Sequence, residues 1–157
     1  MNLIRFHIED FDFVKNITQT TIWSVYPKYY PSGAVQFFSD HHSDERIKAD
    51  IDAGKVFLLE IEGTEIGTVT VADNEINRLF VLPDFQRKGY GRELMDFAEE
   101  MIRKNHDHII LDASLPAKQI YLKRGYVTTK YNMIETENGD YLCYNYESCM
   151  LCYGICI

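Results

Sequence analysis

The stretch from Leu79 to Leu94 constrains the fold of this chain more than any other, because its character changes twice within a short span. Its first part is apolar and ends at Pro83, a residue that cannot continue a β-ladder. A loop follows that contains Gly89 and Gly91. After the loop, apolar residues recur at helical spacing, at Leu94, Phe97, Ala98, Met101 and Ile102. The stretch therefore predicts a buried strand, a glycine loop and an amphipathic helix.

The glycine loop has the features of an anion-binding site. Unpaired N–H groups and the helix dipole favour negative charge at a helix N-terminus, and glycine lets the backbone approach a ligand closely. The cations Arg87, Lys88 and Arg92 belong to the same turn. The dinucleotide fingerprint requires a third glycine where Leu94 stands, and the P-loop spacing is also missing. We predict phosphate binding here; a solvated strand-to-helix turn is the alternative.

The composition indicates an ordinary globular domain. A length of 157 residues favours a single domain, and 46% hydrophobic with 25% charged residues is typical of soluble proteins. The net charge of -8 argues against nucleic acid or an anionic membrane as the main partner. The N-terminus does not resemble a signal peptide, and no apolar run approaches the length of a membrane span. We therefore expect a cytoplasmic protein.

The remaining pattern predicts an α/β (α+β) fold with a mixed central sheet flanked by helices. Strands are expected at 2–8, 56–61, 65–72, 76–82, 109–111, 126–133 and 140–146. A first helix is expected from Asp10 to about Tyr26, with Phe13 on its apolar face. Residues 31–33 are expected to break the helical pattern. Further helices are expected over 43–54, 90–105 and 117–124. Short turns make the middle strands an antiparallel meander, and the helix after the glycine loop implies a parallel crossover.

A second motif begins at Ser114 and includes Ala117, Tyr121, Gly125 and Tyr126. Together with Gln-x-x-Gly-x-Gly at residues 86–91, it resembles the signatures of the GNAT superfamily of N-acetyltransferases, which hold acetyl-CoA. Ser114 stands where this family often has Asn, which alters one side-chain contact to the pantetheine arm, although Ser can still cap the helix. The resemblance covers residues 1–147 as one domain, and residues 148–157 form a tail without a counterpart.

The resemblance implies direct acetyl transfer from acetyl-CoA to an amine, with no metal required. Tyr121 would protonate the departing thiolate, because a phenol is protonated at neutral pH. The strand backbone would meet the oxyanion and pair with the pantetheine, and the loop N–H groups would bind the pyrophosphate. The implied cofactor-binding residues are Leu79, Phe80, Val81, Gln86, Arg87, Lys88, Gly89, Tyr90, Gly91, Arg92, Ser114 and Ala117.

The acceptor side is less defined by the sequence. Glu75 is a candidate general base, and Asn77 could hold a water, although an exposed turn glutamate is the competing interpretation of Glu75. His41 and His42 lie between an aromatic segment and the next helix, where the resembled family builds its acceptor sites. We interpret them as substrate-binding candidates, with action as a base or metal binding as alternatives. The acceptor would be a small-molecule, amino acid or peptide amine.

Other functions stay open at this level. The chain could be a non-catalytic CoA-binding or acyl-CoA-binding regulatory module, or could transfer an acyl group to oxygen or a longer acyl chain. The oligomeric state is open, a homodimer included. Four cysteines lie near the C-terminus, and we expect reduced thiols rather than a metal site; they are Cys143, Cys149, Cys152 and Cys156.

Overall fold

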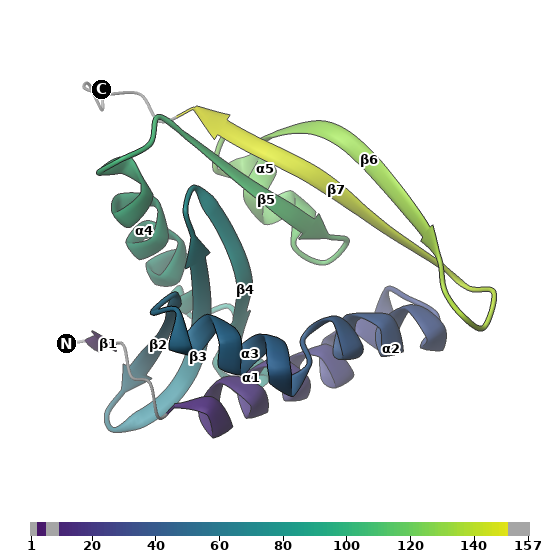
Figure 1. Ribbon diagram of the computed structural model, residues 1–157, viewed down its shortest axis with the longest axis horizontal. Helices are drawn as coiled ribbons and strands as arrows, with labels where there is room; N and C mark the ends of the chain where they lie inside the picture. The colour runs from purple at the N-terminus through teal and green to yellow at the C-terminus, as the bar shows by residue number, and fades with distance from the viewer. Residues whose placement is uncertain (1–2, 6–9, 151–157) are drawn as a thin grey trace.

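The computed structural model describes residues 3–5 and 10–150, and its strands form a single mixed sheet (Figure 1). The strands are β1 (Leu3–Arg5), β2 (Val56–Ile61), β3 (Thr64–Ala72), β4 (Glu75–Val81), β5 (His108–Ser114), β6 (Val127–Glu135) and β7 (Tyr141–Met150). The helices are α1 (Phe11–Val25), α2 (Ser32–His41), α3 (Asp44–Asp52), α4 (Tyr90–Arg103) and α5 (Lys118–Lys123), with 3-10 turns η1 (Tyr26–Lys28) and η2 (Pro83–Phe85).

The order across the sheet is β1-β2-β3-β4-β5-β7-β6. All neighbouring strands are antiparallel except β4 and β5, which are parallel and are joined through α4. This arrangement confirms the predicted α/β class, the antiparallel meander and the parallel crossover. Strand β6 forms one edge of the sheet, and most of its side chains are exposed.

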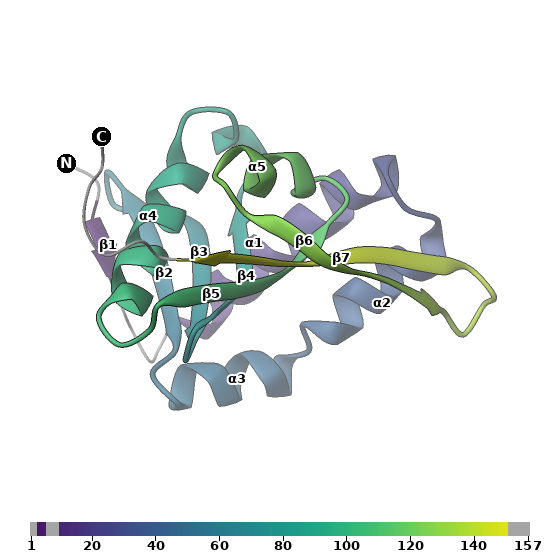
Figure 2. The same ribbon diagram turned by 90° about the horizontal axis from the view of Figure 1, so that it is seen from above.

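Helices cover both faces of the sheet and enclose two apolar clusters. Helices α4 and α5 lie on one face, and α2 and α3 lie on the other (Figure 2). The first cluster contains Leu94, Met95, Ala98 and Ile102 of α4, packed against the sheet. The second gathers residues of α1, α2 and α3 with the sheet residue Phe80. The two clusters use opposite faces of β4, since side chains alternate along a strand.

Strands β4 and β5 separate soon after they meet. Their only paired residues in the described part of the chain are Glu75 and Ile110. On its other side β4 is bulged against β3, with a register shift between Thr68 and Thr70. Arg78 lies at this bulge and has a positive φ of 45°, and a bulge increases local twist and re-aims side chains. The outer edge of β4 is thereby freed from β5 over most of its length.

Some local predictions were wrong. The break expected at Pro31 is in fact the start of α2, because proline is well suited to the first positions of a helix. Phe13 is 45% exposed, and the neighbouring Val14 faces the core instead. Asp10 precedes α1 without a side-chain capping bond. Ser43 does cap α3, through its side chain and the N–H of Arg46, as predicted.

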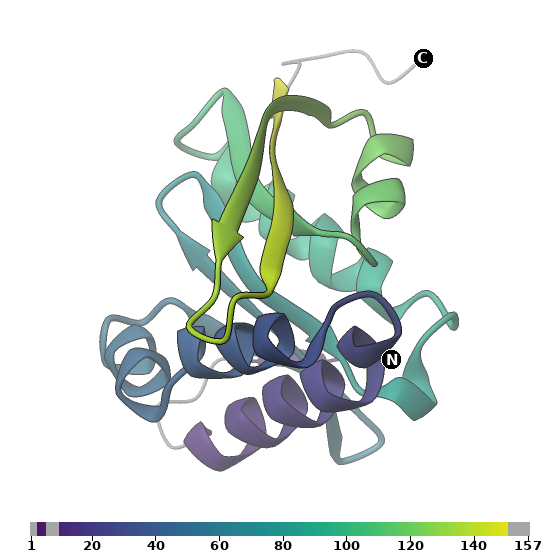
Figure 3. The same cartoon turned by 90° about the vertical axis from the view of Figure 1, so that its right-hand side faces the viewer.

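The hairpin of β6 and β7 reaches across to α2 (Figure 3). At its turn, Asp140 accepts a hydrogen bond from the N–H of Gly33 at 2.9 Å. A Cβ at Gly33 would overlap the side chain of Asn138, so glycine permits this close approach. Tyr30 adds a second link, because its hydroxyl donates to the Cys143 carbonyl at 3.0 Å and accepts from the Leu115 N–H at 2.7 Å.

Strand β7 continues to Met150, so residues 148–150 pair with β5, beyond the domain boundary expected at 147. Cys143 and Cys149 lie in this strand, and both are partly buried. Cys152 and Cys156 lie outside the described residues, as do most of the residues expected in the first strand at 2–8.

Candidate active site

A cleft of about 580 Å³ runs through the sheet where β4 and β5 separate. It begins at the glycine loop, passes between the two strands and ends against α2. Its walls come from both sides of the sheet, so a ligand on the α4 side and a ligand on the α2 side could meet in the middle. The lining residues that matter here are Arg87, Gly89, Gly91, Arg92 and Met95 at one end, Leu79, Val81, Ser114, Ala117 and Tyr121 in the middle, and Tyr26, Phe38, His41, His42, Asn77, Arg78 and Asp112 at the other.

The glycine loop forms one end of this cleft. Gly89 is the N-cap of α4 with a φ of 91°, a conformation that favours glycine. A Cβ at Gly89 or Gly91 would meet nothing within 4 Å, so the backbone faces open space. The first N–H groups of a helix have no partner within the helix. The loop therefore presents free donors and the positive end of the α4 dipole to the cleft.

The charged residues of this loop do not share one role. Arg87 and Arg92 line the cleft. Lys88 instead lies over the ring of Phe85, 5.4 Å from its centroid. Gln86 donates its side-chain amide to the Val81 carbonyl at 2.9 Å, which ties the loop to the end of β4. The Gln86 side chain thus holds the loop in shape, and Tyr90 is placed in the first turn of α4 beside Phe85.

The end of β4 exposes part of its backbone to the cleft. The N–H of Leu82 bonds to Ile66 on β3, so by alternation the peptide groups of Val81 face the opposite edge. The Val81 carbonyl is already bonded to Gln86 and to the Thr21 hydroxyl, the latter at 3.3 Å. The N–H of Val81 therefore remains available to a ligand at this edge. The side chain of Phe80 packs against α1 and α2 instead.

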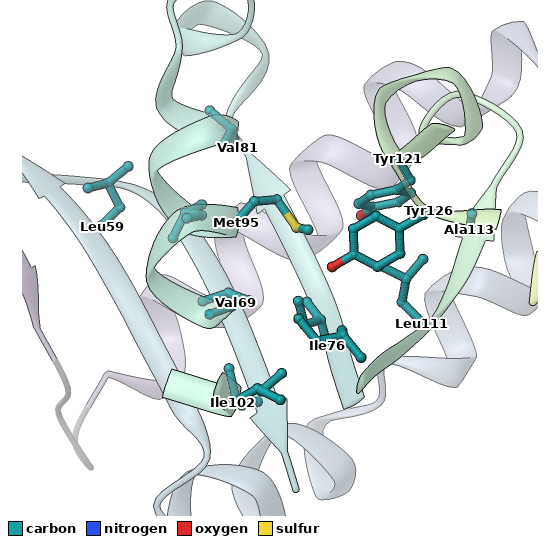
Figure 4. Packing of buried hydrophobic residues seen from close by; sticks show 14 of the residues in the cluster. Leu59, Val69, Ile76, Val81, Met95, Ile102, Leu111, Ala113, Tyr121 and Tyr126 are labelled. Carbon is teal, nitrogen blue, oxygen red and sulfur yellow. The ribbon is translucent and has the colours of Figure 1, made fainter. Parts of the chain in front are cut away.

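Tyr121 comes from α5 and lies across the cleft from α4. Its ring is only 8% exposed and faces Met95 together with Tyr126 and Leu111 (Figure 4). Burial raises the pKa of Tyr121 above its ordinary value, helped by the nearby Tyr26 and Glu147. The phenol is therefore protonated throughout the physiological range, as a proton donor to a thiolate must be.

Ser114 lies at the end of β5 and does not cap α5, which contradicts the prediction. The residue before α5 is Ala117, without a side-chain cap, and Ser114 contributes its carbonyl to the Ala117 N–H. The Ser114 side chain instead hydrogen-bonds to Tyr26, whose pKa is raised by burial to about 12. Tyr26 was not singled out from the sequence, because it is one of eleven tyrosines.

The predicted histidine pair does line the cleft, at the end near α2. His42 accepts a hydrogen bond at Nδ1 from Nε of Arg78, at 3.3 Å. Burial, with the charges of Arg78, His41 and Arg46, lowers the pKa of His42 to about 3. His42 is therefore neutral, and with Nδ1 accepting, its proton is on Nε2. His41 is more exposed and its Nδ1 lies 2.9 Å from Nη1 of Arg46.

Arg78 organises this end of the cleft and was missed by the sequence analysis. Its side chain is 5% exposed and pairs with Asp50 of α3 at 2.9 Å. It also donates to the Thr70 hydroxyl at 3.1 Å and to His42. A buried charge must be paired and hydrogen-bonded, and these contacts meet that need. A charged residue inside the predicted strand at 76–82 was the available signal.

The carboxylates near the cleft are arranged differently from the prediction. Glu75 begins β4 and does not line the cleft, whereas Asn77 does. Burial and the nearby Asp112 raise the pKa of Glu75, and a hydrogen bond to Asn77 opposes this shift. Asp112 of β5 lines the cleft itself, and burial alone raises its pKa. A metal-binding group of three or more His, Cys, Asp or Glu side chains is not found among residues 3–5 and 10–150.

This strand order is combined with a glycine loop at the N-terminus of α4 and a cleft between the separated parallel strands β4 and β5. These features together define the GNAT class of acetyltransferases. The model of the acetyltransferase (GNAT) domain family matches residues 25–141, and the chain belongs to this family. YafP, an uncharacterised N-acetyltransferase of Escherichia coli (strain K12), is 23% identical over 123 residues, which are 78% of this chain and 75% of YafP.

Solved structures share the fold at low sequence identity. A GCN5-related N-acetyltransferase from Rhodopseudomonas palustris has a TM-score of 0.85 at 22% identity, with 96% of each chain covered. The PaiA N-acetyltransferase from Thermoplasma acidophilum, in complex with coenzyme A, has a TM-score of 0.69 at 17% identity, covering 96% of this chain and 99% of PaiA. YncA from Salmonella typhimurium, with acetyl-CoA, has a TM-score of 0.73 at 17% identity, covering 100% and 98%. Within the described residues, no helix is long and apolar enough to cross a membrane.

Proposed function

We propose that this protein transfers the acetyl group of acetyl-CoA directly to a primary amine of a small molecule, amino acid or peptide. The observation that carries the proposal is the continuous cleft, which has an anion-binding loop at one end and a buried, protonated Tyr121 in the middle. Solved relatives of the same fold contain coenzyme A or acetyl-CoA, which supports the same co-substrate here. The family membership supports the acetyltransferase reaction.

The cofactor would lie along the α4 side of the cleft. The loop from Gln86 to Gly91 would donate N–H groups to the pyrophosphate, with Arg87 and Arg92 adding positive charge. The pantetheine arm would extend along the free edge of β4 near Leu79 and Val81, and past Ser114 and Ala117. The thioester would then lie beside Tyr121, with the acceptor amine arriving from the α2 side.

The acetyl transfer forms a carbon–nitrogen bond and breaks a carbon–sulfur bond. The nitrogen of the neutral amine attacks the thioester carbonyl carbon, and backbone N–H groups of β4 stabilise the oxyanion. The carbon–sulfur bond then breaks, and Tyr121 gives its proton to the departing thiolate. The proton lost by the new amide nitrogen restores the phenol. The net products are the N-acetylated amine, free CoA thiol and the proton that the ammonium form of the amine released.

A single variant tests the role of Tyr121. Tyr121→Phe removes the proton donor and keeps the ring, so we expect acetyl-CoA binding by calorimetry to be retained. Free thiol release with an amine panel should fall about 100-fold or more, since general acid catalysis contributes about 10²–10⁴-fold. Tyr141→Phe, on the exposed hairpin, is the matched control and should keep full activity.

The result separates two functions. Acetyl-CoA binding without thiol release by the wild-type protein, across the whole amine panel, would favour the non-catalytic CoA-binding module. Unchanged turnover in Tyr121→Phe would remove the proton-donor role and leave the acetyltransferase assignment in place.

A further inference from the structure

We propose that the acceptor is a small amine with an aromatic or apolar body and no carboxylate beside the amine, and that Asp112 binds its ammonium group. This inference rests on the proposed function, because it names the substrate class of the same cleft. It follows from three features of the α2 end of the cleft: an unpaired carboxylate, aromatic walls, and cations that are already occupied.

The first feature is Asp112 itself. It lies on β5, two residues before Ser114, so both side chains emerge on the same face of the sheet and both line the cleft. In the part of the chain that the structure describes, Asp112 has neither a hydrogen bond nor an ion pair with another residue. Asp112 is exposed on β5, so its carboxylate is open to a ligand, and an ammonium group in the cleft would give it a partner of opposite charge. The neighbouring Glu75 adds further negative charge, as its interaction with Asp112 shows.

The second feature is the aromatic lining around the acceptor end. Tyr26 and Phe38 meet edge to face with ring centroids 4.8 Å apart. Phe80 continues this wall: its ring centroid lies 6.3 Å from that of Tyr26 and 5.6 Å from that of the neutral His42 ring. Such rings bury apolar or aromatic bodies well, and their faces also attract ammonium groups. The lining therefore favours an amine whose body is a ring or an alkyl chain over a highly polar one.

The third feature is the state of the two guanidinium groups at this end. Arg78 is engaged by Asp50, Thr70 and His42. Arg46 bonds to the ring nitrogen of His41, and more weakly to the His41 carbonyl at 3.4 Å. A substrate carboxylate at Arg78 would have to displace one of these contacts, and Arg46 does not line the cleft. It would also approach Asp112 and Glu75, which carry the same charge. An acceptor with a carboxylate on the carbon next to the amine is therefore disfavoured.

The test compares three acceptors with acetyl-CoA at pH 7.5, following free thiol release. 2-Phenylethylamine has the ring and no carboxylate, phenylalanine adds the carboxylate, and ethylamine lacks the ring. We expect kcat/KM for 2-phenylethylamine to exceed the values for both others by about 10-fold or more, since 1.4 kcal/mol of differential interaction is a factor of 10. The hydrophobic tripeptide Phe-Ala-Ala is included to detect a peptide acceptor.

Asp112→Asn tests the contact to the ammonium group. We expect KM for 2-phenylethylamine to rise about two- to five-fold, because an exposed charge pair contributes up to about 1 kcal/mol. The dissociation constant for acetyl-CoA should stay within about two-fold, because the loop is untouched. Asp107→Asn, an exposed carboxylate just before the same strand, is the matched control and should leave KM unchanged.

The outcomes distinguish this inference from the proposed function. Faster transfer to phenylalanine or to Phe-Ala-Ala than to 2-phenylethylamine overturns the inference and leaves the acetyltransferase function standing. An unchanged KM in a folded Asp112→Asn variant also overturns it. If that variant fails to fold, the comparison of the wild-type acceptors decides alone. Absence of thiol release with every amine removes the proposed function and the inference together.

Discussion

His42 makes the folding stability depend on pH in a way that can be measured. Its pKa is lowered from 6.5 to about 3 in the folded protein, first by burial and then by the charges of Arg78, His41 and Arg46. In the unfolded chain the imidazole has its ordinary pKa. Between these two values the unfolded state binds a proton that the native state does not accept, so the free energy of unfolding falls as the pH is lowered from about 6.5 towards 3.

The size of this effect follows from linkage. In the window between the two pKa values, one such group lowers the free energy of unfolding by about 1.4 kcal/mol for each pH unit. At pH 4.5 the accumulated loss relative to pH 7.5 is about 3 kcal/mol. A typical domain has a stability of about 5–15 kcal/mol, so a loss of this size is easily resolved.

His42→Asn isolates the contribution of His42. The Asn side chain offers an oxygen that can accept the Nε–H of Arg78, and it does not titrate. Urea unfolding followed by circular dichroism at pH 7.5 and 4.5 gives the change in unfolding free energy for each protein. We expect the loss on acidification to be about 3 kcal/mol smaller in the variant than in the wild type.

The comparison of the wild type with His42→Asn cancels the contributions of the other titrating groups to the pH dependence. Burial raises the pKa of Glu75, Asp112 and Glu147, so these carboxyl groups act in the opposite direction and favour the native state as the pH falls. They are common to both proteins and cancel in the difference. An equal loss in both proteins, or an NMR titration of His42 with a midpoint near 6.5, would refute the reasoning.

Two further predictions concern packing and hydrogen bonding. Leu94→Ala should lower the free energy of unfolding by about 3 kcal/mol, because Leu94 is fully buried. Met133→Ala, at an exposed position, should change it by less than about 0.5 kcal/mol, and similar urea midpoints for these two variants would contradict the assigned core. Tyr30→Phe should lower it by about 1–2 kcal/mol, since the hydroxyl joins the Leu115 N–H to the Cys143 carbonyl. A Tyr30→Phe protein as stable as the wild type would show that water replaces this link.

Local patterns in the sequence were enough to predict that the glycine loop and Tyr121 belong to one site. The spacing of Gly89 and Gly91 between a strand and a helix is a property of neighbouring residues, and so is the position of Tyr121 within its helix. The structure brings these residues to one cleft, although Ser114 contacts Tyr26 instead of capping α5 and Gln86 bonds to the Val81 carbonyl.

The α2 end of the cleft depended on contacts between distant parts of the chain. Arg78 and Asp50 lie on different elements, β4 and α3, and form an ion pair only because the fold brings these elements together. Helix α2 was missed because Pro31 and Gly33 suggest a turn, while the packing of the hairpin against Gly33 is visible only in three dimensions.

The sequence by itself determined the strand–loop–helix unit at Leu79–Leu94, the fold class and the position of Tyr121, because these follow from periodicity and from glycine spacing over a few residues. Only the tertiary structure decided that Asp112 faces the cleft while Glu75 does not, and that His42 is kept neutral by burial and by the charge of Arg78. The physical reason is that burial, charge pairing and pKa depend on what surrounds a side chain in space. In this protein those surroundings come from strands and helices far apart in the chain.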